Sequence, residues 1–558
     1  MSDLDPRGAL EIINRETGGT DRRKKSDRLL ELIDSLQPAP VFFHDERRTG
    51  YVQTRDSSPR ILPVHSREFK EFAAHLMWEK DHLVPGSEDL SAALNVMNFE
   101  ALSGQQIRLE TRLRWHEDAI WLDMANEKGE AIRITPFGWT IEQDPPILFR
   151  RFSHQQPIVA PVRGGDPWLL KKYWKVPEPD HLLVMTYVAD LLIPGHPHPV
   201  WNVSGSTGAS KSTLQRIVKR MIDPSSMKLL ALPRDERELV QILDHHYLPF
   251  FDNVSSINDM ISNALCRAAT GSGFSKRQLY TDDSDFTYDF TRAVGLNGIN
   301  VVARAADLLD RSLLTDLPGI PIADRREETK ILQGFQEDLP QILGGFLDVV
   351  VIALKLPEPK LTGFFRMADF VSWGYRLAEA LGRDAGNRFL EDYTRNVNSI
   401  ALEAVNADVI GDLLIRTVEN EWEGLTRELL ERLFNDASNK NISTRQKAWP
   451  KSVDAFGRRL RILKEPLGRL GWKLEFGHSN QGSTVRILKT RVTSISSITS
   501  NTLATHEGDT SDTSDANSQT PNGTAKDSSP QIVKCEYCKQ AMTRREYQRH
   551  RCPVGASH

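Results

Sequence analysis

The sequence has few cysteines and no long apolar stretch. Only four of its 558 residues are cysteines, and three of them lie close together near the end of the chain. This distribution excludes a framework of disulfide bonds. No apolar run approaches the about 20 residues that a membrane-spanning helix needs. The first residues also lack the basic and apolar regions of a signal peptide. We therefore expect a cytoplasmic protein with no membrane partner.

The chain also has no large excess of positive or negative charge. The 71 lysines and arginines nearly balance the 75 aspartates and glutamates, which leaves a net charge of −4. Composition alone therefore does not indicate a nucleic-acid-binding protein, and any such surface must be local. The basic cluster at residues 22–25 is more typical of a solvated helix face or tail than of a nucleic-acid arm. The length predicts roughly three or four domains.

Residues 1–165 are expected to form a mixed α/β accessory module. Apolar alternation predicts a hairpin from Val41 to Gln53 and strands at 108–114, 119–123 and 131–135, with a helix near 66–78 between them. We find no catalytic constellation in this region. His116, Glu117 and Asp118 are consecutive, so their side chains point in different directions and favour a turn.

A small-residue loop followed by Lys211-Ser212-Thr213 lies between an apolar strand and a helical pattern. This order is typical of a phosphate-binding loop, whose backbone N–H groups surround phosphate oxygens. Lys211 would reach the β- and γ-phosphates of ATP, and Ser212 would hold Mg²⁺. Ser210 replaces the usual second glycine, which a negative φ would allow. The alternative is a chance Gly/Ser-rich turn. The predicted nucleotide-binding residues are Gly205, Ser206, Thr207, Gly208, Ala209, Ser210, Lys211, Ser212 and Thr213.

A second apolar strand ends at Asp252, downstream of this loop. A carboxylate at the end of a buried strand can bind Mg²⁺ beside a phosphate loop, which is the Walker B pattern. The alternative is an ordinary buried strand that ends in an Asp turn. Asn253 follows where many ATPases have Glu, and Asn cannot accept a proton from water. Hydrolysis is therefore less certain than nucleotide binding. Asn297 ends another apolar strand, where it could sense the γ-phosphate or orient water.

The order of these motifs resembles superfamily 3 helicases, and in particular poxvirus-type primase-helicases and related ATPases of phages and mobile elements. The segments 232–237, 265–271, 279–283 and 296–299 carry the likeness to mobile-element ATPases. The resemblance implies an AAA+-like core with Asn297 as sensor and Arg311 as an arginine finger for a neighbouring subunit. It also implies a homo-oligomeric ring, usually a hexamer. Lys276 and Arg277 would lie near a hairpin that contacts DNA.

Three of these residues have plain alternatives. Arg311 could form a salt bridge with Asp307 or Asp310. Lys276 and Arg277 could belong to a solvated turn, and Asn297 could occupy a simple turn before a glycine.

The remaining chain predicts a helical lid, a DNA-binding module and a tethered finger. Residues 331–420 are helical in pattern, and 421–489 show two helices and a hairpin, as in a winged helix. The second of these helices carries Arg458, Arg459 and Arg461, which suit phosphate contacts; a protein-binding winged helix is the alternative. Residues 490–531 have the composition of a disordered linker.

The last segment, 532–558, has the ligand types of a zinc finger. The predicted Zn²⁺ ligands are Cys535, Cys538, His550 and Cys552, with His558 as a substitute. The segment is basic and could bind nucleic acid or protein.

We thus expect an α/β multidomain protein with a P-loop ATPase core at 166–330, a helical lid, a winged helix and a C-terminal zinc finger. Its expected role is that of an ATP-dependent DNA helicase or translocase in replication of a mobile element or phage-like genome. Single-stranded or forked DNA and replication proteins would be its partners. The alternative is a DNA-binding regulatory protein switched by nucleotide with weak or no hydrolysis. A scaffolding zinc-finger adaptor is a third possibility.

Overall fold

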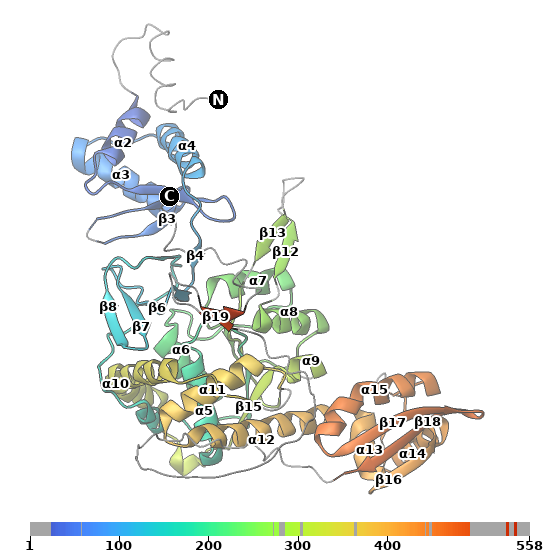
Figure 1. Cartoon of the computed structure of the whole chain (residues 1–558). Helices are drawn as coiled ribbons and strands as arrows, with labels where there is room; N and C mark the ends of the chain where they lie inside the picture. Colours follow the sequence, from blue (N-terminus) through green and yellow to red (C-terminus); the bar gives the residue numbers. More distant parts are fainter. Residues whose placement is uncertain are drawn as a thin grey trace, which may run out of the picture. The chain divides into compact units, whose positions relative to one another are not determined.

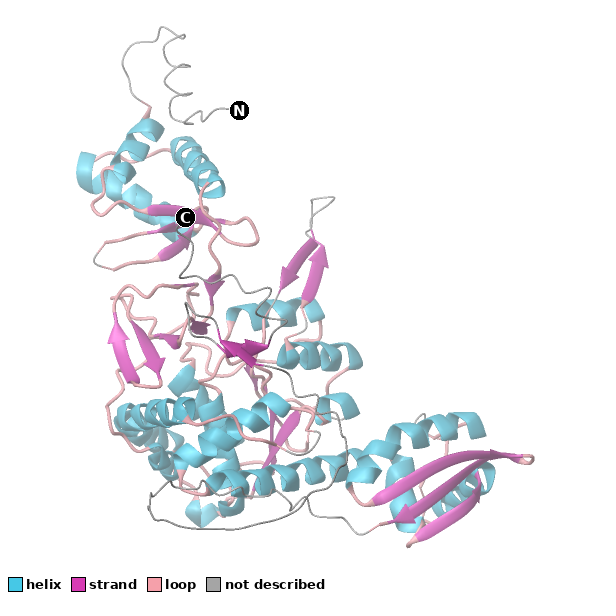
Figure 2. Ribbon diagram, viewed as in Figure 1, coloured by secondary structure: helices cyan, strands magenta, loops and turns pink. Residues whose placement is uncertain are grey.

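The computed structural model describes residues 24–490, except 57, 272, 278–284, 289, 302–304, 362–364, 441 and 446–448, together with the backbone of 532–534 and 541–543. It shows a mixed α/β protein of several packing groups (Figure 1 and Figure 2). The chain forms two compact units, Met1–Ile498 and Thr499–His558. In the second unit, the strands β19 (Ile532–Lys534) and β20 (Ala541–Thr543) pair antiparallel. The predicted zinc ligands Cys535, Cys538, His550 and Cys552 lie outside the described residues.

The first packing group contains three helices and a three-stranded antiparallel sheet. Its elements are α2 (Lys25–Asp34), β1 (Val41–His44), β2 (Gly50–Gln53), β3 (Ile61–Pro63), α3 (Arg67–Asp81) and α4 (Ser87–Ser103). Leu29, Val52, Phe69 and Met97 share one buried core. Ser66 caps α3, because its hydroxyl accepts the backbone N–H of Phe69 at 3.1 Å. The hairpin predicted for residues 41–53 is confirmed.

A four-stranded antiparallel meander follows, but it belongs to a different core. Its strands are β5 (Leu113–His116), β6 (Ala119–Asp123), β7 (Ala131–Thr135) and β8 (Gly138–Glu142), and a short parallel pair, β4 (Leu109–Glu110) and β9 (Leu148–Phe149), flanks them. Ile120, Ile134 and Trp139 pack in the same core as the helices that follow residue 166. The predicted 1–165 module is therefore two groups, because the apolar side chains of the meander are buried against the central domain.

The central domain is built on a four-stranded parallel sheet with the order β11-β14-β10-β15. The strands are β10 (Val200–Gly205), β11 (Phe250–Phe251), β14 (Gly295–Asn297) and β15 (Ser312–Leu317). The connecting helices are α6 (Lys211–Ile222), α7 (Glu236–His245), α8 (Asp259–Thr270) and α9 (Ala306–Leu309). Between α8 and β14, the strands β12 (Phe274–Arg277) and β13 (Asp285–Tyr288) form an antiparallel hairpin. Parallel strands bring their carboxyl ends to one edge of the sheet, so the loops after β10, β11, β14 and β15 meet there.

Further helices pack on the same core rather than forming a separate lid. They are η1 (Pro167–Tyr173), α5 (His181–Asp190), α10 (Glu328–Lys355), α11 (Ala368–Leu381) and α12 (Ala385–Asn406). Two short 3-10 helices, η2 (Glu178–Asp180) and η3 (Ile322–Asp324), have no buried residues. Figure 1 shows α5, α10, α11 and α12 grouped beside the sheet. A Cβ on Gly344 would lie 1.7 Å from the carbonyl oxygen of Val162, so glycine lets this segment cross α10 in direct backbone contact. The helical region predicted at 331–420 is thus largely part of the central core.

The C-terminal group of the first unit has three helices and an antiparallel sheet with the order β16-β18-β17. Its elements are α13 (Val409–Thr417), β16 (Glu421–Leu425), α14 (Thr426–Asn439), α15 (Val453–Arg469), β17 (Trp472–Ser479) and β18 (Gly482–Lys489). Residues 421–425, predicted to begin a helix, form a strand instead. Ile410, Leu413 and Leu414 of α13 lie in this core, so the group begins before the predicted boundary at 421. No helix in the described part of the chain is long and apolar enough to cross a membrane.

Candidate functional site

The loop that joins β10 to α6 lies at the carboxyl edge of the parallel sheet. Gly205 and Gly208 adopt φ values of 144° and 81°. A Cβ on Gly205 would lie 2.5 Å from the carbonyl oxygen of Leu317, so the neighbouring strand leaves no room for a side chain there. The residues Ser206, Thr207 and Gly208 are exposed, whereas Ala209 is buried. The loop leads directly into α6, whose first N–H groups have no partner within the helix, as in an anion site.

Ser210 does not have the negative φ under which we expected a serine to fit this loop. Its φ is 62° and its ψ is 26°, which is the left-handed conformation. An L-residue in this conformation costs about 1–2 kcal/mol relative to the right-handed one. The usual motif has glycine at this position because glycine adopts the left-handed conformation at little cost. This chain keeps the same conformation with a serine.

Lys211 folds back over the loop. Its Nζ donates hydrogen bonds to the carbonyl oxygens of Gly205 at 2.7 Å and Ser206 at 2.9 Å. Burial lowers the pKa of Lys211, while the nearby carboxylates of Asp252 and Asp316 oppose that shift. The ammonium group is thus held at the loop by carbonyl oxygens that a bound phosphate would replace.

The structure brings Ser212 and Asp252 together. The hydroxyl of Ser212, in the first turn of α6, donates to Oδ1 of Asp252 at 2.6 Å, and Asp252 directly follows β11. Hydroxyl and carboxylate oxygens are the hard ligands that Mg²⁺ prefers. The two side chains therefore fit the magnesium role that the sequence predicts for them.

Asn297 and Asn253 are connected by hydrogen bonds. Asn253 has a φ of 52°, a region that asparagine tolerates well. Its backbone N–H donates to Oδ1 of Asn297 at 3.0 Å. Nδ2 of Asn297 donates to Oε1 of Gln215 at 2.7 Å, and Gln215 is fully buried on α6. Asn297 is thus a buried link between the ends of β11 and β14 and the helix that follows the loop.

Gln215 and Arg325 are candidate site residues that the sequence did not reveal. Gln215 lies outside every motif, and only its buried contact with Asn297 identifies it. Arg325 follows β15; its guanidinium would lie 3.2 Å from a Cβ on Gly208, so it rests against the loop. Glu328, at the start of α10, accepts hydrogen bonds from Thr213 at 3.1 Å and Arg216 at 2.8 Å. The segment from Arg325 to Glu328 therefore borders the loop and α6.

Arg311 lies at the opposite edge of the sheet from the loop. Its carbonyl oxygen accepts the backbone N–H of Val200, the first residue of β10. The six residues of β15 span about 20 Å at the usual rise per residue, so Arg311 cannot reach the loop of its own chain. Its side chain, 12% exposed, pairs with the carboxylate of Asp307. This is the salt bridge that we weighed as the alternative to a finger.

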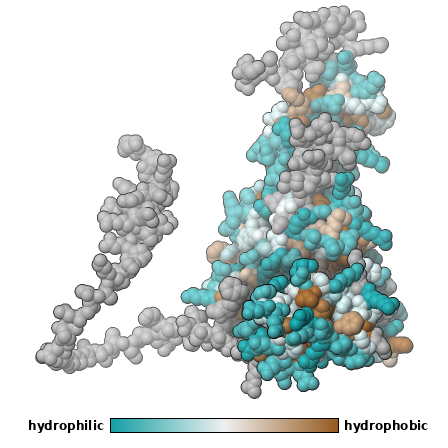
Figure 3. All heavy atoms as spheres, turned by 90° about the vertical axis from the view of Figure 1, so that its right-hand side faces the viewer, coloured by the Kyte–Doolittle hydropathy of each residue, from teal (hydrophilic) through white to brown (hydrophobic). Residues whose placement is uncertain are grey.

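The proposed DNA-binding residues occupy two places. The backbone of Lys276 and Arg277 lies in β12 of the central hairpin, and the description of these residues stops at the backbone. On α15, Arg458 and Arg461 are exposed, whereas Arg459 is partly exposed and pairs with Asp408. Figure 3 shows that the surface of this C-terminal group is mainly hydrophilic around a small apolar patch. α15 thus presents Arg458 and Arg461 to solvent.

A buried charged cluster connects α6 to the meander. Nζ of Lys219 and Nε of Arg112 both lie 3.1 Å from the carboxylate of Asp223, and all three side chains are at most 2% exposed. Burial alone would raise the pKa of Asp223, but Lys219 and Arg112 outweigh it and hold that pKa well below its ordinary value. Arg112 also donates to the carbonyl oxygens of Asp123 and Pro224. The end of α6 is therefore fixed by a residue of the meander.

Two family models match the chain. The Actinomycete integrative conjugative element replication protein model matches residues 176–398, and the AICE RepA C-terminal domain model matches 409–505. These two regions are therefore similar to that replication-protein family. The family match supports a role in the replication of a conjugative element. The second match begins at α13, where the structure also begins the C-terminal group. No curated protein matches the chain.

Two solved structures show weaker likeness. The apo structure of the NrS-1 C terminal region is 12% identical, with a TM-score of 0.36 over 83% of this chain and 99% of that chain. A structure of JCV Helicase bound to a small molecule is 16% identical, with a TM-score of 0.22 over 43% of this chain and 64% of that chain. Both TM-scores are too low to carry an argument about this fold.

Proposed function

We propose that this protein is an ATP-dependent DNA helicase or translocase that acts in the replication of an integrative conjugative element. The observation that carries the proposal is the hydrogen bond between Ser212, in the helical turn that follows the loop of residues 205–210, and Asp252. A serine after the loop lysine and a carboxylate at a neighbouring strand end are the pair that Mg²⁺–nucleotide sites require. The loop conformation, with Gly205, Gly208 and Ser210 all at positive φ, supports the same site.

In this proposal, ATP and Mg²⁺ bind at the carboxyl edge of the sheet. Lys211 leaves the carbonyl oxygens of Gly205 and Ser206 for the phosphates, and Arg325 supplies a second cation beside Gly208. Asn253 cannot take a proton from the attacking water, so water activation must come from elsewhere or turnover is slow. Asn297 responds to the nucleotide through Gln215 and the backbone of Asn253.

The proposal includes a homo-oligomeric ring. Arg311 is about 20 Å from its own loop by the length of β15, so it can act only on the nucleotide of a neighbouring copy. Entering such a site requires it to exchange the carboxylate of Asp307 for phosphate oxygens. The ion pair holds the guanidinium in place until a neighbouring copy offers a stronger anion.

DNA contacts are proposed on the hairpin of Lys276 and Arg277 and on α15. The order α13, β16, α14, α15, β17, β18 supports the proposal of a winged helix, whose recognition helix and hairpin would contact DNA. Arg461 and Lys464 lie over the ring of Phe476 at 5.3 and 5.9 Å, so the basic face of α15 continues onto the hairpin. A C-terminal Zn²⁺ finger at Cys535, Cys538, His550 and Cys552 would add a further contact with DNA or with replication proteins.

ATP hydrolysis with and without single-stranded DNA tests the function. For the full chain, we expect DNA-stimulated hydrolysis that Lys211→Ala abolishes. Arg220→Ala, further along the same helix, serves as a control for loss of a basic residue. ATP binding without any turnover would contradict the motor and leave the alternative, a nucleotide-switched DNA-binding protein. Asn253 is the observation that favours that alternative.

Arg311 and Asp307 test the ring. Arg311→Ala should keep ATP binding but lose hydrolysis, whereas Asp307→Asn, which releases Arg311, should keep hydrolysis. A purely structural ion pair predicts instead that both variants lose thermal stability and activity to a similar extent.

A further inference from the structure

Three potential metal-binding side chains converge on the side of the central domain where β10 begins. Asp190 is the last residue of α5, and His196 and His198 lie in the segment that leads into β10. Nε2 of His196 lies 3.0 Å from Oδ1 of Asp190, and Nδ1 of His198 lies 2.7 Å from Oδ2. The three donor atoms all lie within 4.8 Å of one another. All three residues are buried, with exposures of 0%, 7% and 3%.

The carboxylate of Asp190 needs a positive partner. A buried charge is costly unless it is paired with a counter-charge or coordinates a metal. In the part of the chain that the structure describes, no lysine or arginine forms an ion pair with Asp190, and its hydrogen-bond partners are the two imidazoles. A neutral imidazole donates a hydrogen bond but brings no charge. The compensating charge must therefore come from an imidazolium or from a bound cation.

The segment that carries the histidines is stiff. Pro194, Pro197 and Pro199 alternate with Gly195, His196 and His198, and proline fixes the backbone φ. Gly195 has a φ of 86°. The imidazole rings lie 4.4 Å apart, and the ring of His196 also packs near Trp373 at 6.3 Å. The two nitrogens are thus held in place before any ligand binds, which lowers the entropy cost of coordination.

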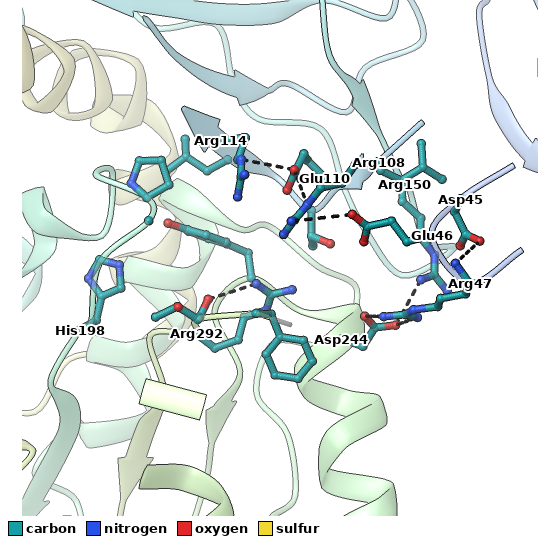
Figure 4. Close-up of a pocket in the computed structure, with 18 residues that line it drawn as sticks. Asp45, Glu46, Arg47, Arg108, Glu110, Arg114, Arg150, His198, Asp244 and Arg292 are labelled. Carbon is teal, nitrogen blue, oxygen red and sulfur yellow. Dashed lines mark hydrogen bonds and ion pairs between the residues drawn. The ribbon is translucent and has the colours of Figure 1, made fainter. Parts of the chain in front are cut away.

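Solvent can approach from one side. His198 and Gly195 line a cavity of about 300 Å³, which Figure 4 shows with His198 at its edge. The charges of the cavity are largely paired, since Arg47 and Arg150 contact Asp244 and Arg108 contacts Glu110. The cavity therefore does not itself require an anion, but it can supply a water molecule as a further ligand.

We propose that Asp190, His196 and His198 bind a divalent transition metal, for which Zn²⁺ is the best fit. Two imidazole nitrogens and a carboxylate are a common zinc ligand set, with metal–ligand distances of about 2.0–2.2 Å and a fourth position for water. The metal would not contact bound ATP, because the length of β10 places the site about 20 Å from the phosphate loop. By binding Asp190 and both histidines, the metal would hold the segment between α5 and β10 against the end of α5. This proposal does not depend on the proposed ATPase function.

Metal analysis of the full chain tests the site. The double variant Cys535→Ser with Cys538→Ser removes two of the four predicted C-terminal ligands and so disables that finger, and it should retain about one equivalent of zinc after dialysis. Adding His198→Ala should bring this content to zero. Adding His181→Ala, a histidine at the other end of α5, should leave it unchanged. A folded double variant without zinc would overturn the proposal, and so would zinc that survives His198→Ala.

Cobalt provides a second measurement if His198→Ala does not fold. Co²⁺ bound to the double variant should give a visible spectrum without the charge-transfer band of thiolate ligands, since imidazoles and a carboxylate coordinate it. Asp190→Asn, which keeps the shape of the side chain, should weaken that spectrum at equal Co²⁺ concentration. A thiolate band, which only Cys266 or Cys552 could provide in this variant, or no spectrum at all, would contradict the assignment.

Discussion

The side-chain amide of Asn297 donates a hydrogen bond to Oε1 of Gln215 at 2.7 Å, inside the core of the central domain. This bond joins the end of β14 to the helix that begins at Lys211. It therefore connects the residue that we expected to sense nucleotide with the element that would bind it.

A double-mutant cycle on this pair should reveal coupling. Asn297→Ala and Gln215→Ala should each lower the free energy of unfolding by about 1–3 kcal/mol, because each leaves a buried polar partner unsatisfied. The double variant should cost less than the sum of the two, with a coupling of about 0.5–3 kcal/mol as found for contacting residues. Urea unfolding of the four proteins measures this. If the losses of the two single variants simply add in the double variant, the hydrogen bond contributes nothing to stability.

Ser210→Gly should not destabilise the protein. Glycine removes the cost of a left-handed L-residue, about 1–2 kcal/mol, and this offsets the about 0.5–1 kcal/mol that glycine usually costs through backbone entropy. ATP affinity should be equal or higher. Ser226→Gly is the matched control, since Ser226 is exposed and is not among the residues at positive φ. A clear loss of stability for Ser210→Gly, but not for the control, would show that the left-handed conformation of Ser210 carries no energetic cost.

The buried carboxylate of Asp223 should make stability depend on acid pH. Its pKa is lower in the fold than in the unfolded chain, so its contribution is complete above the ordinary aspartate pKa of about 4 and is lost as pH falls below it. Asp223→Asn should cost about 3–5 kcal/mol at neutral pH, because it leaves Lys219 and Arg112 buried without a counter-charge. The difference from wild type should shrink by about 1.4 kcal/mol per pH unit below about 4.

Thermal unfolding from neutral to acid pH measures that difference. Asp384→Asn, at a 90% exposed side chain, provides the control and should show a small effect at every pH. A gap between wild type and Asp223→Asn that stays constant into acid would rule out the lowered pKa.

Arg458→Ala and Arg461→Ala should weaken DNA binding to a similar extent for different sequences. Each removes one exposed cation of α15, so the slope of log K against log salt concentration should fall by about one per residue. Arg416→Ala makes the same charge change on α13, where Arg416 pairs with Asp412 at 2.7 Å. Fluorescence anisotropy at several salt concentrations compares the three. Equal losses for Arg416 and Arg458 would indicate only a net-charge effect.

The sequence could predict those parts of the site that depend on local patterns. The strand before Gly205, the helix after Lys211 and the approach of Asp252 follow from apolar runs and from the meeting of parallel strand ends. The conformation of Ser210 could not be predicted, because the φ of a serine is decided by the loop around it. Gln215 and Arg325 belong to no motif, and only the packed structure brings them to Asn297 and Gly208.

Long-range packing also explains why the packing groups differ from the ranges that the sequence predicts. Arg112 is 111 residues from Asp223 in sequence, and no local pattern indicates that the meander covers the end of α6. In the C-terminal group, residues 421–425 run directly into α14, so the strand pairing of Glu421 with Leu488 is hidden behind a helical pattern. In both regions, contacts with residues far away in the sequence determine the structure.

The cluster of Arg112, Lys219 and Asp223 limits how this protein can be divided. The matched family region begins at residue 176, yet a fragment cut there would leave Lys219 and Asp223 without Arg112 and uncover apolar side chains of the central core. The meander is therefore an integral part of the central domain. Any recombinant fragment, chimera or natural shortening that discards residues 109–160 removes the cation that pairs with Asp223 and uncovers apolar side chains of the central core. Such a fragment must replace both, or its central domain will be destabilised.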